Sequence, residues 1–302
     1  MPPLLQKLVF TTIRVGLRCL AVVMPRPAGR LAYRIFSTPR SRARVPAAAV
    51  DIMARAERVT LDVDGEQVAA YRWTRGDEER PRAVIAHGWE SRAARLVVWV
   101  EPLLDAGFEV VSYDAPAHGE SEGRVSDPLR FCRALLATAD HFGPIDVAVG
   151  HSLGTIALVL SVVGGRRLGY EDLSIERMVI VGGADSGVDA MAMFCDLLGL
   201  GEGFLPLLLD GAADAAGGHS VASFDVHRIF VDRPIPVFWQ HDRDDTAVPL
   251  AAAQRVDAAC PHVELLVTEG LGHHAIARDP EVIRRAVDFL LAEPSRRLGL
   301  AS

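Results

Sequence analysis

From residue 51 onward, short apolar runs alternate with longer segments in which apolar residues follow helical spacing. This alternation of strands and helices is typical of a mainly parallel β-sheet covered by helices on both faces. A β-hairpin precedes it, because Val59–Val63 and Gln67–Trp73 flank Asp64 and Gly65, a pair that favours a tight turn. The strands expected in the alternating part are Ala83–Ala86, Val110–Tyr113, Val147–Val149, Met178–Val181, Pro236–Trp239 and Val263–Val267.

The segments between these strands predict helices over Arg92–Leu104, Pro128–His141 and Leu153–Val163. A last helix is expected over 280–291, because Asp279 can cap its first turn and a proline follows at the favoured first helical position. The sequence therefore predicts an α/β fold.

One segment interrupts this alternation. Asp185–Phe230 separates two expected strands by far more than one helix and two short loops. It is rich in apolar residues, and its part Gly211–Gly218 consists mostly of glycine and alanine, which predicts a mobile stretch. We interpret residues 185–230 as an inserted helical lid over an active site; the alternative is a small helical subdomain that only packs against the rest.

The N-terminal fifty residues form a second unit of different character. Residues 4–24 are mostly apolar, and the polar residues among them follow a 4, 3, 4 spacing that predicts an amphipathic helix. Such a helix can dock on the protein's own body, lie in a membrane interface or, less consistent with its interrupting charges, form part of a targeting segment. We expect a basic arm over 1–50 and one domain over 51–302. The residues on the polar stripe are Lys7, Thr11, Arg14 and Arg18.

Composition and charge narrow the function. Half of the 302 residues are hydrophobic and 24% are charged, a mixture typical of a soluble globular protein. Residues 1–50 hold nine basic residues and no acid, so residues 51–302 carry 23 basic against 39 acidic side chains, a net charge of −16. An acidic domain repels phosphates, which argues against nucleic-acid binding.

The cysteines indicate where the protein resides. The chain has four of them, far apart and without a C-x-x-C pair, which favours neither a disulfide framework nor a metal site. We therefore expect a cytoplasmic protein without metal or cofactor, able to make peripheral membrane contact only through residues 1–50. The four are Cys19, Cys132, Cys195 and Cys260.

The strongest chemical signal is the G-x-S-x-G sequence Gly150–Gly154, which lies between the strand 146–149 and the helix Leu153–Val163. On such a tight strand-to-helix turn Ser152 is exposed above the sheet, and its neighbours must be small so that the backbones can pass closely. The helix N-terminus also offers backbone N–H groups to an anion. These features predict a serine nucleophile.

A serine nucleophile needs a base, and the base needs an acid that orients it. Three aspartates, Asp242, Asp244 and Asp245, follow the strand 236–240, and two histidines, His273 and His274, follow the strand 263–267. Both loops are expected at the edge of the sheet that presents the serine, where sites of open parallel sheets assemble. The chain order serine, acid, histidine is that of the nucleophile-elbow enzymes.

At this point the sequence resembles the α/β-hydrolase superfamily, from about residue 59 to residue 291. Besides Gly150–Gly154 and the later aspartate and histidine loops, His87–Trp89 is similar to the oxyanion loop of the family, and Asp114–Ser121 is similar to its D-x-P-G-H-G-x-S segment. Ala117 departs from that segment, where the family often has glycine. The resemblance implies the α/β-hydrolase fold, a mainly parallel sheet with an inserted lid.

The resemblance also implies roles for single residues. Ser152 would be the nucleophile, His273 the base, and Asp245 the acid, since Asp245 precedes a Val-Pro pair as in the D-x-x-V-P of the family. The oxyanion donors would be the backbone N–H groups of Trp89 and Leu153.

Several neighbours could compete for these roles. His274 is the alternative base, and Asp242, Asp244 and the more distant Asp185 are alternative acids. The others are expected to be structural: His87 and His118 to brace loops, Asp114 to stabilise a turn, and His151 to fill space.

A serine at the elbow argues against the haloalkane dehalogenases and epoxide hydrolases of this superfamily, which use aspartate there. The resemblance implies a carboxylesterase or lipase-like hydrolase that forms an acyl-enzyme on an apolar acyl ester, since the insertion is apolar and the His87–Trp89 loop has a single glycine. Thioesterase, C–C bond hydrolase and acyltransferase reactions could use the same three residues. A non-catalytic binding scaffold is the alternative from another class.

Overall fold

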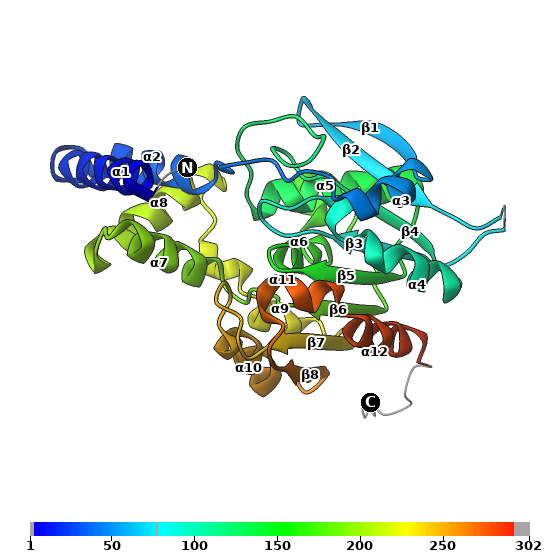
Figure 1. Ribbon diagram of the computed structural model, residues 1–302. Coiled ribbons are helices and arrows are strands. Elements are labelled where there is room, and N and C mark those ends of the chain that lie inside the picture. The colour runs from blue at the N-terminus through cyan, green and yellow to red at the C-terminus, as the bar shows by residue number, and fades with distance from the viewer. Residues whose placement is uncertain (1–2, 77, 293–302) are drawn as a thin grey trace.

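A computed structural model describes residues 3–76 and 78–292. Its centre is one eight-stranded sheet in the order β1-β2-β4-β3-β5-β6-β7-β8 (Figure 1). The β1/β2 and β2/β4 pairs are antiparallel and all later pairs are parallel, so the predicted mainly parallel α/β architecture is confirmed. The strands are β1 Glu57–Val63, β2 Glu66–Trp73, β3 Arg82–Ala86, β4 Glu109–Tyr113, β5 Val147–His151, β6 Arg177–Val181, β7 Val237–Asp242 and β8 Val263–Thr268.

Helices cover both faces of this sheet and enclose two hydrophobic cores. On one face, α4 and α12 pack on the strands around residues such as Trp99. On the other, α5, α6, α9 and α10 enclose a second core around residues such as Phe131. These helices are α4 Val100–Asp105, α5 Pro128–Phe142, α6 Gly154–Ser161, α9 Val226–Asp232, α10 Leu250–Ala259 and α12 Pro280–Leu291. We call this sheet with its helices, together with the short α3 (Val50–Ala54) and α11 (Gly272–Ala275), the body.

The N-terminal capping that the sequence predicts is present at α12. The Asp279 side chain accepts hydrogen bonds from the N–H groups of Glu281 and Val282, with Pro280 in the first turn.

The single helix predicted over Arg92–Leu104 is wrong in its first half. The chain there forms two 3₁₀ turns, Ala93–Arg95 and Val97–Trp99, before α4 begins at Val100. The buried Asp114 carboxylate accepts the N–H of Ala93 and bonds Arg92, so this tertiary contact fixes the start of the segment outside a regular α-helix.

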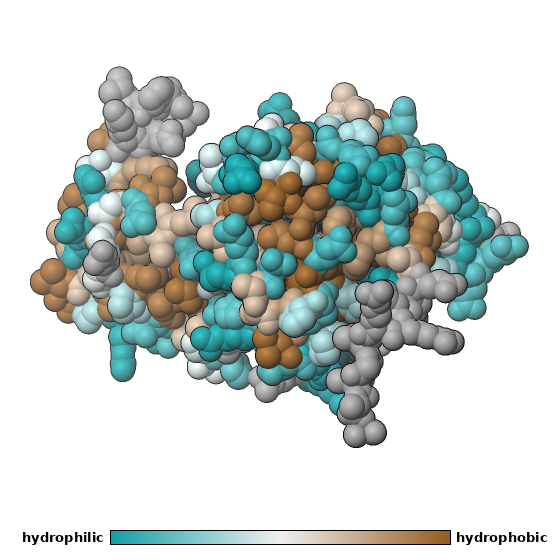
Figure 2. Space-filling view, turned by 90° about the horizontal axis from the view of Figure 1, so that it is seen from below, coloured by the Kyte–Doolittle hydropathy of each residue, from teal (hydrophilic) through white to brown (hydrophobic). Residues whose placement is uncertain are grey.

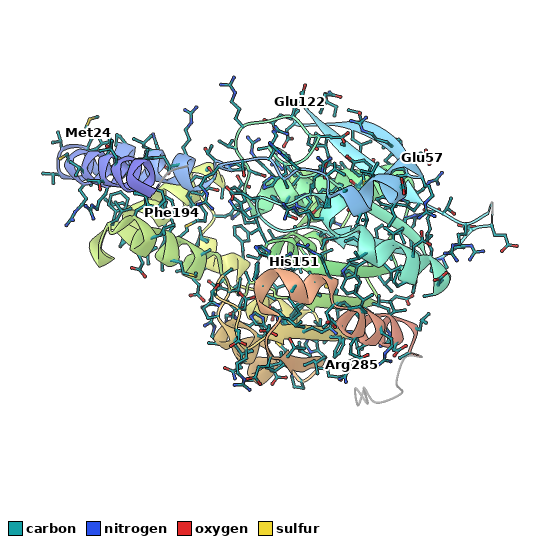
Figure 3. The ribbon with its side chains drawn as sticks, viewed as in Figure 1. Met24, Glu57, Glu122, His151, Phe194 and Arg285 are labelled. Carbon is teal, nitrogen blue, oxygen red and sulfur yellow. The ribbon has the colours of Figure 1, made fainter. Side chains whose placement is uncertain are left out.

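A second group of helices, which we call the cap, lies beside the body at the left of Figure 1. It joins α1 and α2 from the N-terminus to α7 and α8 from the insertion, around a third hydrophobic core that includes Leu17, Phe204 and Leu208. In Figure 3, Phe194 of α7 lies beneath the N-terminal helices, and its ring meets that of Phe36 edge to face at 5.3 Å. The helices are α1 Pro3–Val23, α2 Pro25–Phe36, α7 Gly187–Leu198 and α8 Leu205–Ala215.

Two glycines allow α2 and α8 to touch backbone to backbone. A Cβ atom on Gly29 would overlap the Leu207 carbonyl, and one on Gly211 would overlap the Gly29 carbonyl. The first part of the stretch that we expected to be mobile belongs to α8, and Gly211 is a buried helical residue of this crossing.

The insertion itself divides between the two units. Its helices α7 and α8 belong to the cap, whereas α9 packs with Phe230 into a core of the body. The N-terminal helices α1 and α2 pack on α7 and α8 within the cap. No helix within the described residues is long and apolar enough to span a membrane.

The segment between α2 and the body is attached to loops of the body. Arg40 forms an ion pair with Glu90, and the Arg42 guanidinium donates to the backbone carbonyls of Gly119, Ser121 and neighbouring residues. Residues 37–46 are therefore bound to the edge of the sheet on which the candidate site lies.

Candidate active site

Ser152 lies on a strained turn between β5 and α6. Its φ is 55°, a left-handed conformation that is uncommon outside glycine, and its N–H donates to the Val181 carbonyl at 3.1 Å. The neighbouring backbones pass very closely: a Cβ atom on Gly88 would lie 2.7 Å from the Ser152 Cβ, and one on Gly154 would overlap the Ala86 carbonyl. The small residues of the motif are therefore required by packing.

His273 contacts both other residues predicted for the site. Its Nε2 lies 3.0 Å from the Ser152 Oγ, and its Nδ1 lies 2.7 Å from Oδ2 of Asp245. It is carried by the short helix α11, just after β8. The fold thus joins three side chains that are up to 121 residues apart in the chain.

Asp245 is held as a buried carboxylate. Its Oδ1 accepts two backbone N–H groups, from Ala247 and Val248, each at 2.8 Å. Burial alone would raise the pKa of the Asp245 carboxyl, but the hydrogen bonds from His273 and from these two N–H groups outweigh burial and lower it below its usual range. Asp245 is therefore ionised whenever His273 needs an acceptor.

The competing aspartates of the same loop have other partners. Asp242 is fully buried and accepts the Thr268 hydroxyl at 2.7 Å and the Leu271 N–H at 3.1 Å. Asp244 accepts the Gly270 N–H at 2.9 Å. Both carboxylates shape the loop that carries the histidine rather than contacting its ring.

Asp185, the acid considered from the earlier strand, belongs to a separate cluster. It contacts the His227 Nδ1 at 2.8 Å and accepts a hydrogen bond from Arg255 at 3.0 Å. This cluster joins the start of the insertion to α9 and α10.

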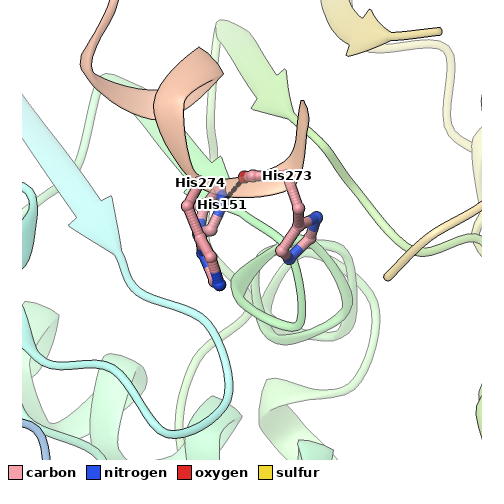
Figure 4. A group of neighbouring side chains, drawn as sticks. All are labelled: His151, His273 and His274. Carbon is pink, nitrogen blue, oxygen red and sulfur yellow. Dashed lines mark hydrogen bonds between the residues drawn. The ribbon is translucent and has the colours of Figure 1, made fainter. Parts of the chain in front are cut away.

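His151 does more than fill space. Its Nε2 donates to the His273 carbonyl at 2.9 Å, so it holds the backbone of the histidine that contacts Ser152 (Figure 4). Burial, followed by the electrostatic effect of the adjacent His273 side chain, lowers the pKa of His151 to about 3, so its ring is neutral. Apart from its adjacency to Ser152, nothing in the amino-acid pattern around His151 indicates this role.

Three imidazoles, those of His151, His273 and His274, place ring nitrogens within 4.8 Å of one another. Both ring nitrogens of His273 are already engaged by Ser152 and Asp245, as is Nε2 of His151 by a carbonyl. A metal could therefore be held here only if it displaced these hydrogen bonds. His274 lies edge to face with His273, and among the described residues it is His273, not His274, that hydrogen-bonds Ser152 and Asp245.

The two histidines that were expected to brace loops do so. His87 donates from Nδ1 to the Gly88 carbonyl and accepts the Ala115 N–H at Nε2, while Nε2 of His118 accepts the Glu90 N–H. These bonds connect the loop after β3 to the loop after β4.

Asp114 is a turn-stabilising carboxylate, as the sequence analysis expected. It accepts the N–H groups of Ala93 and Glu120, each at 2.8 Å, and the hydroxyl of Tyr71 at 3.1 Å.

A pocket opens directly over Ser152 and His273. Trp89, Glu90 and Arg95 line it from the loop after β3, and His274 and Arg278 line it from the segment after β8. Among the described residues that line it, none comes from a helix of the cap. The role of the insertion as a lid therefore stays a prediction. The sequence analysis did not identify the two arginines, because neither belongs to a motif.

Two backbone amides lie next to Ser152, one on the Trp89 loop and one at Leu153, which follows it in the chain. Within the described residues, neither the Trp89 N–H nor the Leu153 N–H donates to another protein group. These are the two amides that the family resemblance implies as oxyanion donors.

Comparisons with known proteins agree with this architecture. Residues 83–286, more than half of the chain, match the alpha/beta hydrolase family. A comparison with curated protein sequences finds no match.

Solved structures share the fold at low sequence identity. An esterase of Pyrococcus furiosus has a TM-score of 0.60 at 19% identity and covers 84% of this chain and 97% of its own. An esterase from Exiguobacterium antarcticum has a TM-score of 0.58 at 14% identity, with 78% and 100% covered. A bacterial membrane phospholipase A, described as a virulence factor, has a TM-score of 0.57 at 13% identity and covers 95% and 97%. Coverage of 95% includes most of the N-terminal helices.

Proposed function

The chain belongs to the alpha/beta hydrolase family, and we propose that it is a serine hydrolase that cleaves carboxylic esters through an acyl-enzyme. The observation that carries the proposal is the continuous hydrogen-bonded series from Ser152 Oγ to His273 and on to Asp245, with separations of 3.0 and 2.7 Å. Serine alone is a poor nucleophile at neutral pH, and such a series is what activates it.

In the first half of the proposed reaction, Ser152 Oγ attacks the ester carbonyl while Nε2 of His273 accepts its proton. The Asp245 carboxylate accepts the N–H of Nδ1, which leaves Nε2 as the proton acceptor and stabilises the imidazolium that forms. His273 then gives the proton to the alkoxide leaving group as the C–O bond breaks, and the acyl group remains on Ser152.

The negative charge that develops on the carbonyl oxygen needs donors. We propose the N–H groups of Trp89 and Leu153, the first on the loop after β3 and the second at the start of α6. Removal of one such donor from a comparable site lowers the rate by about 100- to 1000-fold. His87 and His118 position the Trp89 loop through their bonds to Gly88 and Glu90.

In the second half, a water molecule replaces the alcohol. His273 accepts a proton from the water, the resulting hydroxide attacks the acyl carbonyl, and the proton returns to Ser152 Oγ as the carboxylic acid leaves. If an alcohol or amine entered in place of water, the same steps would transfer the acyl group.

Two observations favour acyl-ester chemistry over displacement at a saturated carbon. Two of the similar solved structures are esterases, from Pyrococcus furiosus and Exiguobacterium antarcticum, although at 19% and 14% identity they establish only the shared fold. In addition, Ser152 rather than an aspartate occupies the elbow, which suits acyl transfer and not displacement at a saturated carbon.

The test is labelling by a fluorophosphonate, with peptide mass spectrometry to locate the adduct. We expect the adduct on Ser152 of the full chain and none on the folded Ser152→Ala variant. Hydrolysis of p-nitrophenyl esters of short to medium chain should accompany it. A folded, unlabelled wild-type protein would reject the serine hydrolase, and labelling without hydrolysis of any ester would favour acyl transfer to another acceptor.

A further inference from the structure

Two arginines, Arg95 and Arg278, line the pocket above Ser152. Arg95 ends the first 3₁₀ turn after β3, and Arg278 ends the 3₁₀ turn Ile276–Arg278 that leads into α12. They approach from segments 183 residues apart in the chain, so only the tertiary fold brings two guanidinium groups to one pocket.

Neither guanidinium group has a carboxylate partner within the described residues. Other arginines of the body do: Arg82 pairs with Glu109, Arg92 with Asp114 and Arg255 with Asp185. The Nε of Arg95 is also buried without a hydrogen-bond partner.

The remaining groups of the pocket leave this positive charge unopposed. Glu90 lines the pocket, but the Arg40 guanidinium binds both of its carboxylate oxygens, at 3.1 and 3.2 Å. The Asp245 carboxylate is bound to His273 and two backbone amides. The pocket is therefore electropositive in a domain whose net charge is −16.

We propose that Arg95 and Arg278 bind a negatively charged group, a carboxylate or a phosphate, on the ester that Ser152 attacks. The proposal rests on the proposed function and names its substrate class. Arginine is suited to this task because its planar donors match the oxygens of both anions and it stays charged at any physiological pH. The acidic surface of the body would otherwise repel such a substrate.

The test compares matched neutral and anionic esters. One pair is p-nitrophenyl butyrate and p-nitrophenyl hemisuccinate, which differ by a carboxylate at the end of a four-carbon acyl chain. The other is glycerol monobutyrate and its glycerol 3-phosphate counterpart, which place a phosphate on the alcohol side. The readout is the ratio of kcat/KM for the anionic ester to that for the neutral ester.

In Arg95→Gln and Arg278→Gln we expect this ratio to fall about ten-fold in at least one pair. Loss of one hydrogen bond to a charged group lowers kcat/KM by roughly that factor. The pair that responds identifies the anion. Arg233→Gln is the matched control, because Arg233 is exposed, has no carboxylate partner among the described residues and lies outside the pocket. Its ratio should equal that of the wild type.

Unchanged ratios in both variants, with labelling and hydrolysis intact, would reject the anion site alone. Loss of labelling and of all ester hydrolysis in the wild type would reject the proposed function as well. Arg278 is exposed, so its variant tests the proposal even if Arg95→Gln fails to fold.

A second, independent observation concerns the outer side of α1. Leu8, Val15 and Val22 are 63%, 52% and 86% exposed, and their seven-residue spacing places them on one side of the helix. The opposite side, with Leu17, is buried in the cap. In Figure 2, brown apolar residues also gather on the lobe at the left that holds the cap.

Basic residues lie on α1 itself and on α2, the helix that follows it and packs against it. Arg18, Arg26 and Arg34 are exposed and have no carboxylate partner among the described residues, and residues 1–50 contain no acid. An apolar strip beside unpaired arginines is complementary to a bilayer with anionic head groups.

We propose that the outer side of α1 binds the surface of an anionic bilayer, with Leu8, Val15 and Val22 inserted among the lipids. The helix α1 would then pack against the other helices of the cap on one side and contact lipid on the opposite side. The bilayer contact would hold the cap, and with it the body, at the membrane surface.

Co-sedimentation with vesicles of phosphatidylglycerol and phosphatidylcholine tests this proposal on the full chain. The variant Leu8→Ser, Val15→Ser, Val22→Ser should bind at least ten-fold more weakly. The matched control Val50→Ser, Val98→Ser, Val231→Ser changes three exposed valines of the body and should bind like the wild type. Arg18→Gln and Arg26→Gln should each weaken binding about five-fold, and added salt should do the same.

Equal sedimentation of the wild type and the α1 variant would overturn the proposal. So would sedimentation velocity that finds a dimer which the α1 variant abolishes, because a second copy of the chain would then cover this surface. Because these substitutions lie on the exposed side of α1, they leave the core of the cap intact.

Discussion

The body buries apolar side chains on both faces of its sheet, whereas the cap buries them on only one side of its first helix. On β3, Val84 and Ile85 point to opposite cores and each is 1% exposed, while on α1 Leu17 is 2% exposed and Val22 is 86% exposed. The body thus buries the apolar side chains of its sheet within itself, whereas the cap leaves the outer apolar side of α1 exposed.

The two units also differ in how they treat charge. Arginines of the body mostly pair with its many carboxylates, and the exceptions that line the pocket lie beside Ser152. The arm has nine basic residues and no acid of its own. Under the two proposals, the chemistry lies in the unit that packs on both faces of the sheet, and surface attachment lies in the unit assembled from two distant parts of the chain.

The largest expected effect is on chemistry in the body. Ser152→Ala and His273→Ala should each lower kcat on a p-nitrophenyl ester by about 10⁶-fold, because the nucleophile and its base act as one unit. The free energy of unfolding should change little, so circular dichroism and denaturant unfolding serve as controls. His274→Ala should have a far smaller effect; a loss as large as that of His273→Ala would reassign the base.

The next largest effect distinguishes Asp245, the proposed acid, from the other aspartates that could have taken this role. Asp245→Asn should lower kcat by about 10⁴-fold, since an amide there favours the wrong tautomer of His273. Asp242→Asn and Asp185→Asn should mainly lower the free energy of unfolding, because their carboxylates bond other parts of the body. Steady-state kinetics and urea unfolding on the same preparations distinguish the two outcomes, and a 10⁴-fold loss in Asp185→Asn would contradict the assignment.

A smaller effect, on stability, is expected when the close contact between α2 and α8 in the cap is disturbed. Gly29→Ala should lower the free energy of unfolding by about 3 kcal/mol, because its Cβ would overlap the carbonyl of Leu207 in α8. Gly16→Ala is the matched control: Gly16 is an exposed helical glycine with open space around it, so alanine should stabilise by about 0.5 to 1 kcal/mol. If Gly29→Ala lowered kcat on a soluble ester as strongly as Asp245→Asn, the cap would be part of the chemistry.

The smallest effect is the dependence of the body's stability on pH. Burial, followed by the electrostatic effect of the neighbouring His118 side chain, lowers the pKa of His87 to about 3. The unfolded chain therefore binds a proton at this residue below about pH 6.5, whereas the folded chain does so only near pH 3. Stability should fall as the pH drops through this window, by at most about 2 kcal/mol for His87 between pH 6.5 and 5.

Urea unfolding at pH 7, 6 and 5 measures that slope, and His87→Asn should make it less steep. An equal slope in the two proteins would mean that His87 is not the neutral buried group described here. His151, whose pKa is also lowered to about 3, adds a similar slope of its own.

Much of the body could be read from the sequence, because its signals are local. Strands such as β5 are short apolar runs, the hairpin is marked by Asp64-Gly65, and the elbow is marked by the glycines around Ser152. The motif resemblance favoured Asp245 as the partner of His273, and the structure places these two side chains in contact. The hydrogen-bond partners of Asp242 and Asp244 depend on the packing of the loops after β7 and β8 against each other, which the sequence does not show.

What the sequence by itself determined is the local conformation: an amphipathic first helix, the strand and helix alternation, and a serine on a strained turn. The tertiary structure alone decided which surfaces meet. Periodicity predicts that α1 has an apolar side but not what covers it, and no motif brings Arg95 to Arg278 or Gly29 to Gly211. The reason is physical: spacing along the chain fixes which side chains share a face, whereas contacts between residues more than 100 positions apart depend on how the whole chain packs.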